Sequence, residues 1–191
     1  MPLRDAVERA LQPRVDRGAG GLCDSSGIAP IAPAAMSHTD LIAEIFAAFS
    51  TEGTAFPAMT LRGGDALDAD KPAPPFDVLV DAVSDEYLEA HPWGSGWLDA
   101  ASWRHYLPFM MEYALRHVER PSEVTDALLT SFRPPDRDPP RLGSLSKPQE
   151  TVVLRFLDAL AHIETSASRD LAAMVLSEWW TPGAIPKDLD D

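Results

Sequence analysis

WRHYLPFMMEYALRH, residues 103–117, decides what kind of fold this chain can adopt. Its aromatic, Leu and Met residues recur at helical spacing, which predicts a core-forming helical segment. Pro108 lacks a backbone N–H and clashes with the carbonyl group four residues earlier, at a cost of about 3 kcal/mol inside a helix. We therefore expect one helix to end near Tyr106 and another to start at Pro108, with Glu112 and Arg116 as an i,i+4 ion pair on a wet face.

Amphipathic spacing on both sides of this stretch predicts further helices. Ser37 or Thr39 is suited to cap the first, and Ser146 with Gln149 has the pattern of a capping box. The proline-rich segment 133–141 predicts an extended, stiff linker. The expected helices are 39–50, 76–90, the pair around Pro108, 122–131, 146–163 and 168–180. The fold class is mainly α: a single compact domain of about five or six helices joined by Pro/Gly-rich loops, with at most a minor strand near Ala58–Leu61.

Residues 1–35 differ in composition from the rest of the chain, since they have arginines but no lysine or aromatic residue. They are predicted to be a flexible Pro/Gly/Ala-rich tail or an upstream extension, with the folded domain over 36–185 and an acidic C-terminal tail over 186–191. A secretion signal is the rival for the first segment, but prolines interrupt its apolar part.

The chain of 191 residues has 30 acidic and 16 basic side chains, which gives a net charge of −14. Such a field repels nucleic acid and anionic membranes and would steer a basic protein toward the domain, although acidic surfaces also simply keep proteins soluble. The apolar run Leu107–Leu115 is far shorter than the roughly 18–20 residues of a membrane span. Cys23 is the only cysteine. We expect a cytoplasmic protein that contacts neither nucleic acid nor membrane.

Four residues around the start of the opening stretch could form a catalytic site if the fold brought them together: His91, Asp99, His105 and Glu112. Metal binding is not expected, because the sequence lacks the HExxH pattern. No glycine-rich phosphate loop or dinucleotide fingerprint is present either, so no cofactor is predicted. Trp179 and Trp180 cannot point the same way from a regular helix, which makes them candidates for an interface.

Seven short strings between Met59 and Ala184 resemble an uncharacterised bacterial family of unknown function. They are MTLRGG (59–64), PPFD (74–77), SWRHYLP (102–108), TDALL (125–129), RPPDRDPPRL (133–142), LSKPQETVVLRFL (145–157) and EWWTPGA (178–184). The resemblance covers about two-thirds of the chain and implies a small, mostly helical cytoplasmic protein. It assigns no catalytic residue, so nothing is carried over to His105 or Glu112.

Three functional hypotheses follow from these observations. The first is a non-enzymatic acidic protein-binding module, one version of which is an immunity-type inhibitor of a basic toxin. The second is an enzyme with a site formed by His91, Asp99, His105 and Glu112. The third is a structural subunit of an assembly that associates through Trp179 and Trp180.

Overall fold

The computed structural model describes residues 37–50 and 56–181. The chain divides into Met1–Ala35 and Met36–Asp191, and the described residues all belong to the second unit. The two predicted tails, 1–35 and 186–191, lie outside the described residues.

All regular elements in the described part of the chain are helices, which confirms the mainly α prediction. In chain order they are α2 (His38–Ala48), α3 (Leu61–Asp68), α4 (Asp85–Ala90), the 3-10 helix η2 (Pro92–Trp97), α5 (Ala100–Arg116), α6 (Glu123–Ser131), the 3-10 helix η3 (Leu142–Ser144), α7 (Lys147–His162), α8 (Arg169–Val175) and the π-helix η4 (Leu176–Trp180).

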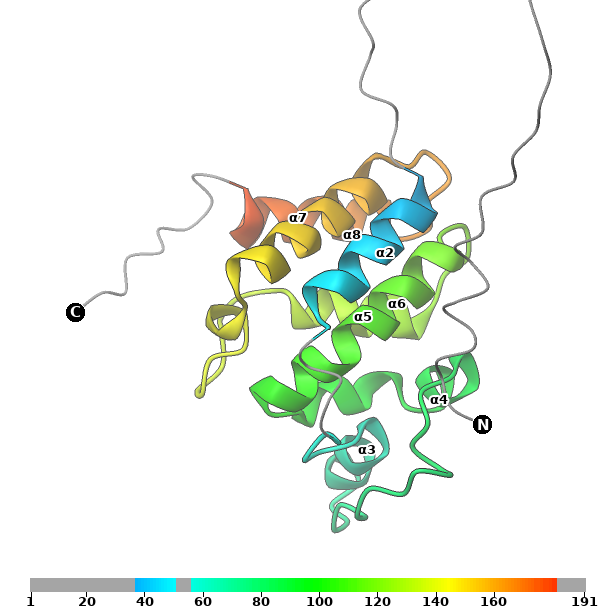
Figure 1. Ribbon diagram of the computed structural model, residues 1–191, viewed down its shortest axis with the longest axis vertical. Coiled ribbons are helices and arrows are strands. Elements are labelled where there is room, and N and C mark those ends of the chain that lie inside the picture. Colours follow the sequence, from blue (N-terminus) through cyan, green and yellow to red (C-terminus); the bar gives the residue numbers. More distant parts are fainter. Residues whose placement is uncertain (1–36, 51–55, 182–191) are drawn as a thin grey trace, which may run out of the picture. The chain divides into compact units, whose positions relative to one another are not determined.

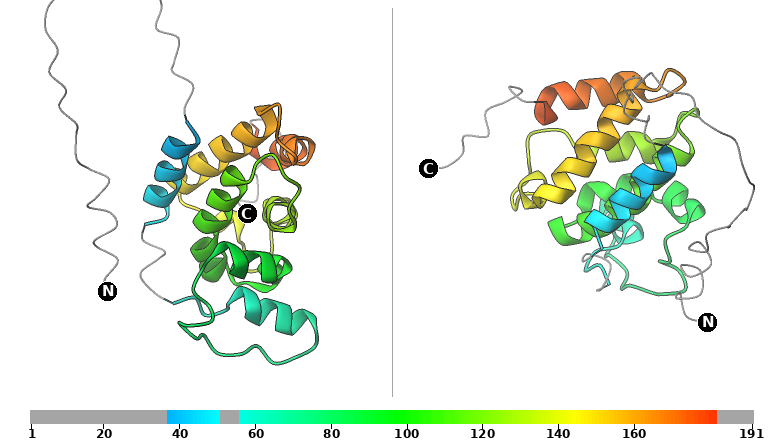
Figure 2. Two further views of the ribbon diagram at one scale, coloured as in Figure 1. Left: turned by 90° about the vertical axis from the view of Figure 1, so that its right-hand side faces the viewer. Right: turned by 45° about the horizontal axis from the view of Figure 1, so that its top comes forward.

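The long helix α5 lies at the centre of the packing. It contacts α2 on one side and α6 on another, while α7 packs against α2 and α8. Figure 1 shows α7, α2 and α5 side by side, and the turned views in Figure 2 keep α2 beside α7. The shorter elements α3, α4 and η2 gather at one end of these helices (Figure 1), with α3 packed on η2.

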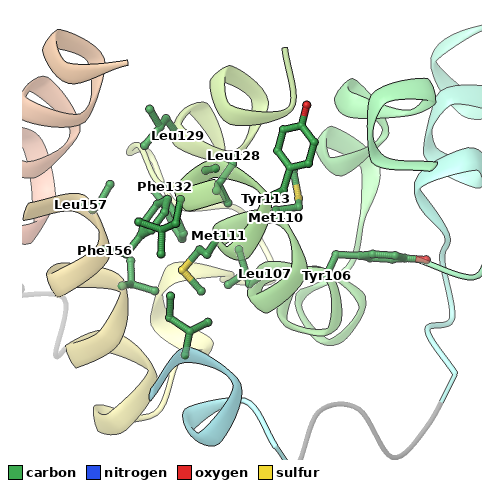
Figure 3. Close-up of a cluster of buried hydrophobic side chains, with 14 of the residues drawn as sticks. Tyr106, Leu107, Met110, Met111, Tyr113, Leu128, Leu129, Phe132, Phe156 and Leu157 are labelled. Carbon is green, nitrogen blue, oxygen red and sulfur yellow. The ribbon is translucent and has the colours of Figure 1, made fainter. Parts of the chain in front are cut away.

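The apolar core lies where α5, α6 and α7 meet. Figure 3 shows Phe132 and Phe156 close to Met111, with Leu128 and Leu129 of α6 beside them. All five side chains are fully buried. Tyr106 and Tyr113 also leave α5 here, with their hydroxyl groups pointing away from the cluster (Figure 3).

The predicted break at Pro108 is wrong, because α5 runs without interruption from Ala100 to Arg116. The apolar face is continuous across the proline, with Tyr106 and Leu107 buried before it and Met110 after it. Each such side chain contributes about 1.5–3 kcal/mol when buried. Together they exceed the cost of about 3 kcal/mol for an internal proline.

Helices α2, α6 and α7 confirm the predictions closely. Ser37 caps α2, its hydroxyl accepting a hydrogen bond from the Asp40 amide at 3.2 Å. The predicted capping box of α7 is present, and the Gln149 side chain accepts from the Ser146 amide at 2.9 Å. These helices were predictable because the apolar stripe of each one, and for α2 and α7 also the cap, lies within one short segment.

Helix α3 and the 3-10 helix η2 were not predicted, because glycines occupy positions where a helix-forming residue is usual. The glycines allow the two backbones to touch. A Cβ atom on Gly64 would lie 2.1 Å from the Gly94 carbonyl oxygen, and one on Gly94 would lie 2.0 Å from the Leu61 oxygen. Residues 58–61, considered for a strand, instead form a bend and the first turn of α3.

The prediction of a helix over 76–90 is also wrong in its first half. Only α4 is helical, and Ser84 caps it by accepting a hydrogen bond from the Tyr87 amide at 3.2 Å. The preceding residues form a tight turn that a polar network holds in place, and the apolar side chains of 78–80 are exposed. The proline-rich segment 133–141 does not run extended either, because it bends back on itself.

Candidate binding surface

Residues 77–81, named here the apolar turn, carry three exposed apolar side chains in a row. Val78, Leu79 and Val80 are 61%, 90% and 51% exposed. The turn is closed by its own hydrogen bonds: the Asp77 carboxylate accepts from the Leu79 amide at 2.9 Å, and the Asp77 carbonyl accepts from the Asp81 amide at 2.7 Å. Its shape is therefore set by polar contacts, and its apolar side chains are free to contact something else.

A buried ion pair fixes the apolar turn to the rest of the domain. The Asp81 side chain has no exposed area, and the Arg62 guanidinium of α3 donates to it from Nε at 2.9 Å and from Nη2 at 2.7 Å. Tyr87 of α4 donates its hydroxyl to Asp81 at 3.1 Å. The hydrogen bond from Arg62 holds the pKa of Asp81 below its usual value despite burial. The turn is thus tied to both neighbouring helices.

One aromatic side chain, Phe76, adjoins the apolar turn in sequence, and a second one, Phe56, packs on it. The Phe76 ring stacks on that of Phe56 with their centroids 4.4 Å apart, and Phe56 is itself strongly exposed. Contiguous exposed apolar groups of this kind mark contact sites more often than single exposed residues do. Phe56, Phe76 and the apolar turn together form the candidate binding surface.

The segment around this surface is strongly acidic. From residue 65 to 86 it contains seven acidic residues and one basic residue, Lys71. Two of the acidic groups are neutralised by ion pairs, Asp81 with Arg62 and Asp85 with Arg116. The remaining acidic groups give this end of the domain a negative field that favours a basic partner.

Two sets of ionic contacts hold α4 against the C-terminal half of α5. Asp85 accepts from Arg116 at 2.5 Å and lies 3.0 Å from Nε2 of His117, and the hydrogen bond from Arg116 lowers the pKa of Asp85. Glu89 accepts hydrogen bonds of 2.6 Å from both the Tyr113 hydroxyl and Arg120. The charged residues near the end of α5 thus have partners within the domain.

The four candidate catalytic residues each contact a different neighbour. Nδ1 of His91 lies 2.6 Å from the Asp65 carboxylate, and the His105 ring packs on Tyr106 with centroids 5.0 Å apart. The predicted ion pair of Glu112 with Arg116 is confirmed, at 3.4 Å.

The fourth candidate, Asp99, is the N-cap of α5. It accepts from the Ala101 and Ser102 amides at 2.9 Å and from the Ser102 hydroxyl at 2.6 Å. Burial raises the pKa of Asp99, but these hydrogen bonds outweigh it and keep the pKa below its usual value. None of the four residues lines the pocket between η2, α6 and residues 133–142 or the pocket beside Glu89, Tyr113 and Arg120. The catalytic set therefore stays a prediction without geometric support.

Trp179 and Trp180 are both partly buried against the core. Trp180 donates from its indole nitrogen to the Phe132 carbonyl at 3.1 Å and makes an edge contact with the Phe132 ring. Residues Leu176–Trp180 form a π-helix, in which each turn holds more residues than a turn of an α-helix. The wider turn allows two successive tryptophans to pack against the same core. The half-exposed tryptophans are instead Trp93 and Trp97 of η2.

The sequence did not single out the apolar turn, because Val80 matched the apolar spacing of a longer helix. A signal was nevertheless present. Asp77 and Asp81 bracket three consecutive apolar residues just after two prolines, a pattern of turn formers that helical spacing does not explain.

Two further observations limit the kinds of site. Among the described residues, no three His, Cys, Asp or Glu side chains are grouped so that they could hold a metal ion. In the same part of the chain, none of the helices has both the length and the apolar character needed to cross a membrane.

Comparison with known families identifies the domain. The model of a family of unknown function, DUF6714, matches residues 37–184. The chain belongs to this family. The matched range contains every described helix and all residues of the candidate binding surface. No curated protein and no solved structure matches the chain, so membership of the family assigns no role to any residue.

Proposed function

We propose that this domain is a non-enzymatic protein-binding module that engages its partner through the candidate binding surface. The observation that carries the proposal is the exposure of Val78, Leu79 and Val80 on a turn fixed by the fully buried Asp81 carboxylate. Apolar side chains on a flexible loop would lose conformational freedom on binding. A turn that is already fixed avoids much of that cost.

The charge around the surface defines the class of partner. A complementary protein would offer an apolar pocket for the turn, bordered by Lys or Arg side chains that face the acidic segment. An immunity-type inhibitor of a basic toxin is one protein of this description. The net charge of −14 would accelerate such an encounter and make it sensitive to salt. The same charge disfavours nucleic acid and anionic membranes as partners.

The enzyme hypothesis gains nothing from the positions of His91, Asp99, His105 and Glu112. Trp179 and Trp180 pack on the domain's own core but are only partly buried, so the structural-subunit hypothesis keeps them as interface candidates. In a second form of this hypothesis, two copies would associate through their apolar turns. The test below therefore includes self-association as an outcome.

The test compares the full chain with Leu79→Ser and with Leu154→Ser as its matched control. Leu154 lies on α7 and is 37% exposed, so the control removes the same apolar group from a different surface. Each protein is immobilised and exposed at low salt to an extract of the native host, and any retained protein is then purified for direct titration. Sedimentation of each chain alone measures self-association.

We expect a basic protein that binds the full chain and Leu154→Ser alike and that dissociates as salt is raised. Loss of a central apolar anchor costs at least about 2 kcal/mol, so Leu79→Ser should bind about 30-fold more weakly. Equal binding by the two variants would exclude the apolar turn as the site. Concentration-dependent dimers that Leu79→Ser abolishes would replace the proposal with the structural-subunit hypothesis.

A further inference from the structure

A second site lies on a different part of the domain and does not depend on the proposed function. A pocket of about 360 Å³ is bounded by η2, by α6 and by the proline-rich segment 133–142. Its volume is within the range of about 300–1,000 Å³ that is typical of small-molecule sites. Three arginines and one aspartate line it, although the chain as a whole is strongly acidic.

Arg141 is the central residue of this pocket, since its side chain reaches it although the residue is only 3% exposed. The guanidinium donates from Nε to the Leu98 carbonyl at 3.0 Å and from Nη2 to the carbonyls of Gly96, at 3.2 Å, and Leu98. These contacts anchor the segment to η2. They leave Nη1 without a hydrogen bond to any other described residue.

No carboxylate within the described ranges forms an ion pair with Arg141. Burial together with the nearby charge of Arg137 lowers the pKa of Arg141 to about 10, although the charges of Asp136 and Asp99 act in the opposite direction. Arg137 is exposed at the rim of the pocket. Arg133 differs from both, because Glu178 neutralises it through two hydrogen bonds of 2.7 Å.

Asp136 is the one acidic group in the lining, and its oxygens are engaged by the backbone. One oxygen accepts from the amides of Arg137, Arg141 and Leu142 at 2.7–3.0 Å, and the other accepts from Gly143 at 2.8 Å. Asp136 thereby shapes the loop that carries Arg141. Among the lining residues, its charge offsets one of the two arginines that have no ion pair with another described residue, Arg137 and Arg141.

We propose that this pocket binds a small molecule that carries a carboxylate or phosphate group. The oxyanion would accept hydrogen bonds from Arg141 Nη1 and from Arg137, because guanidinium groups pair with both kinds of oxyanion in the same geometry. Thr130 and Ser131 of α6 also line the pocket, although the Ser131 hydroxyl already donates to the Leu128 carbonyl and accepts from the Trp103 indole. The half-exposed Trp93 ring forms an apolar side against which a planar part of the ligand can lie.

The test is a titration of the full chain, followed by NMR signals of the Trp93 indole N–H and of the Arg141 Nε–H. The probes are phenyl phosphate, benzoate and inorganic phosphate, with benzyl alcohol as the neutral comparison. We expect saturable shifts with phenyl phosphate or benzoate, and which of the two binds more tightly identifies the preferred oxyanion. Benzyl alcohol should cause none. The proposal would be overturned if neither anion caused saturable shifts at concentrations up to about 10 mM. Dissociation constants above that concentration correspond to very weak binding.

Variants separate a specific site from a general charge effect. Arg137→Gln should weaken binding about tenfold, the effect of losing one charge-assisted hydrogen bond, and should fold normally because Arg137 is exposed. Arg155→Gln is the matched control, since it removes the same charge from α7, where Arg155 pairs with Glu44. Equal weakening by both variants would overturn the proposal. Trp93→Ala should weaken phenyl phosphate but not inorganic phosphate, and an equal effect on both would exclude the planar contact.

Discussion

The core helices and the region from α3 to η2 are held together by different interactions. The core formed by α2, α5, α6, α7 and α8 depends on large apolar side chains that are fully buried. Between Leu61 and Trp97, the side chains of Leu61, Tyr87 and Leu88 also join this core. The contact of α3 with η2 and the apolar turn, however, depend on a close backbone approach at two glycines and on the buried ion pair of Arg62 with Asp81. The core buries its apolar groups, whereas the second region exposes Val78, Leu79 and Val80. A turn whose shape is set by polar contacts can present apolar side chains to a partner without losing that shape.

The first prediction concerns the core. Phe156 is completely buried and packs against the Phe132 ring, so Phe156→Ala should lower the free energy of unfolding by about 3–5 kcal/mol. Urea denaturation followed by far-UV circular dichroism measures the loss. Leu154→Ala, two residues earlier on the exposed face, should change it by no more than about 0.5 kcal/mol. A loss below about 1 kcal/mol for Phe156→Ala would mean that the core can repack around the cavity.

The second prediction concerns the buried ion pair. Asp81→Asn should cost about 2–3 kcal/mol at pH 7, somewhat less than a fully buried pair, because Arg62 is partly exposed. The pKa of Asp81 is lowered in the folded chain, so its stabilising effect is present above the ordinary value of 3.8 and is lost as the pH falls below it. The difference between the natural chain and Asp81→Asn should therefore shrink between pH 7 and pH 3.

The control for this prediction is Asp85→Asn, which breaks the more exposed pair with Arg116. That change should cost about 0–1 kcal/mol at pH 7, because solvent screens such pairs. If Asp85→Asn were the more costly variant, the buried pair would not be what holds the apolar turn.

The third prediction tests the backbone contact between α3 and η2. Gly64→Ala should cost about 1–3 kcal/mol, because its Cβ atom would meet the Gly94 carbonyl and a backbone cannot move aside as a flexible side chain can. Hydrogen exchange should become faster in α3 while α5 keeps its protection. Gly96→Ala, whose Cβ would meet nothing within 4 Å, is the matched control and should exchange like the natural chain.

The smallest effect on stability is expected at the apolar turn itself. Leu79 is 90% exposed, so Leu79→Ser should change the free energy of unfolding by less than about 0.5 kcal/mol. The same denaturation experiment measures it. A clear loss of stability would show that Leu79 is covered within the domain, and would remove the basis for its role in partner binding.

Local signals in the sequence were sufficient wherever an element's spacing and caps lie within one short segment. The stripe and cap of α2, the α6 helix and the Ser146–Gln149 box of α7 are examples. The candidate site was much less predictable. Its acidic surroundings follow from composition, but the apolar turn was assigned to a helix because Val80 fits helical spacing. That helix is excluded by the contact of Asp81 with Arg62, which lies nineteen residues earlier in the chain.

The sequence by itself determined a mainly α domain with an acidic surface, because apolar periodicity and net charge are properties that neighbouring residues already carry. Only the tertiary structure decided that Pro108 lies inside a helix, that Gly64 and Gly94 bring two backbones together, and that Arg141 is buried beside a pocket. Each of these depends on the free energy of contacts between segments distant in sequence. Such contacts outweigh the secondary-structure preferences of individual residues, and no short sequence pattern reveals them.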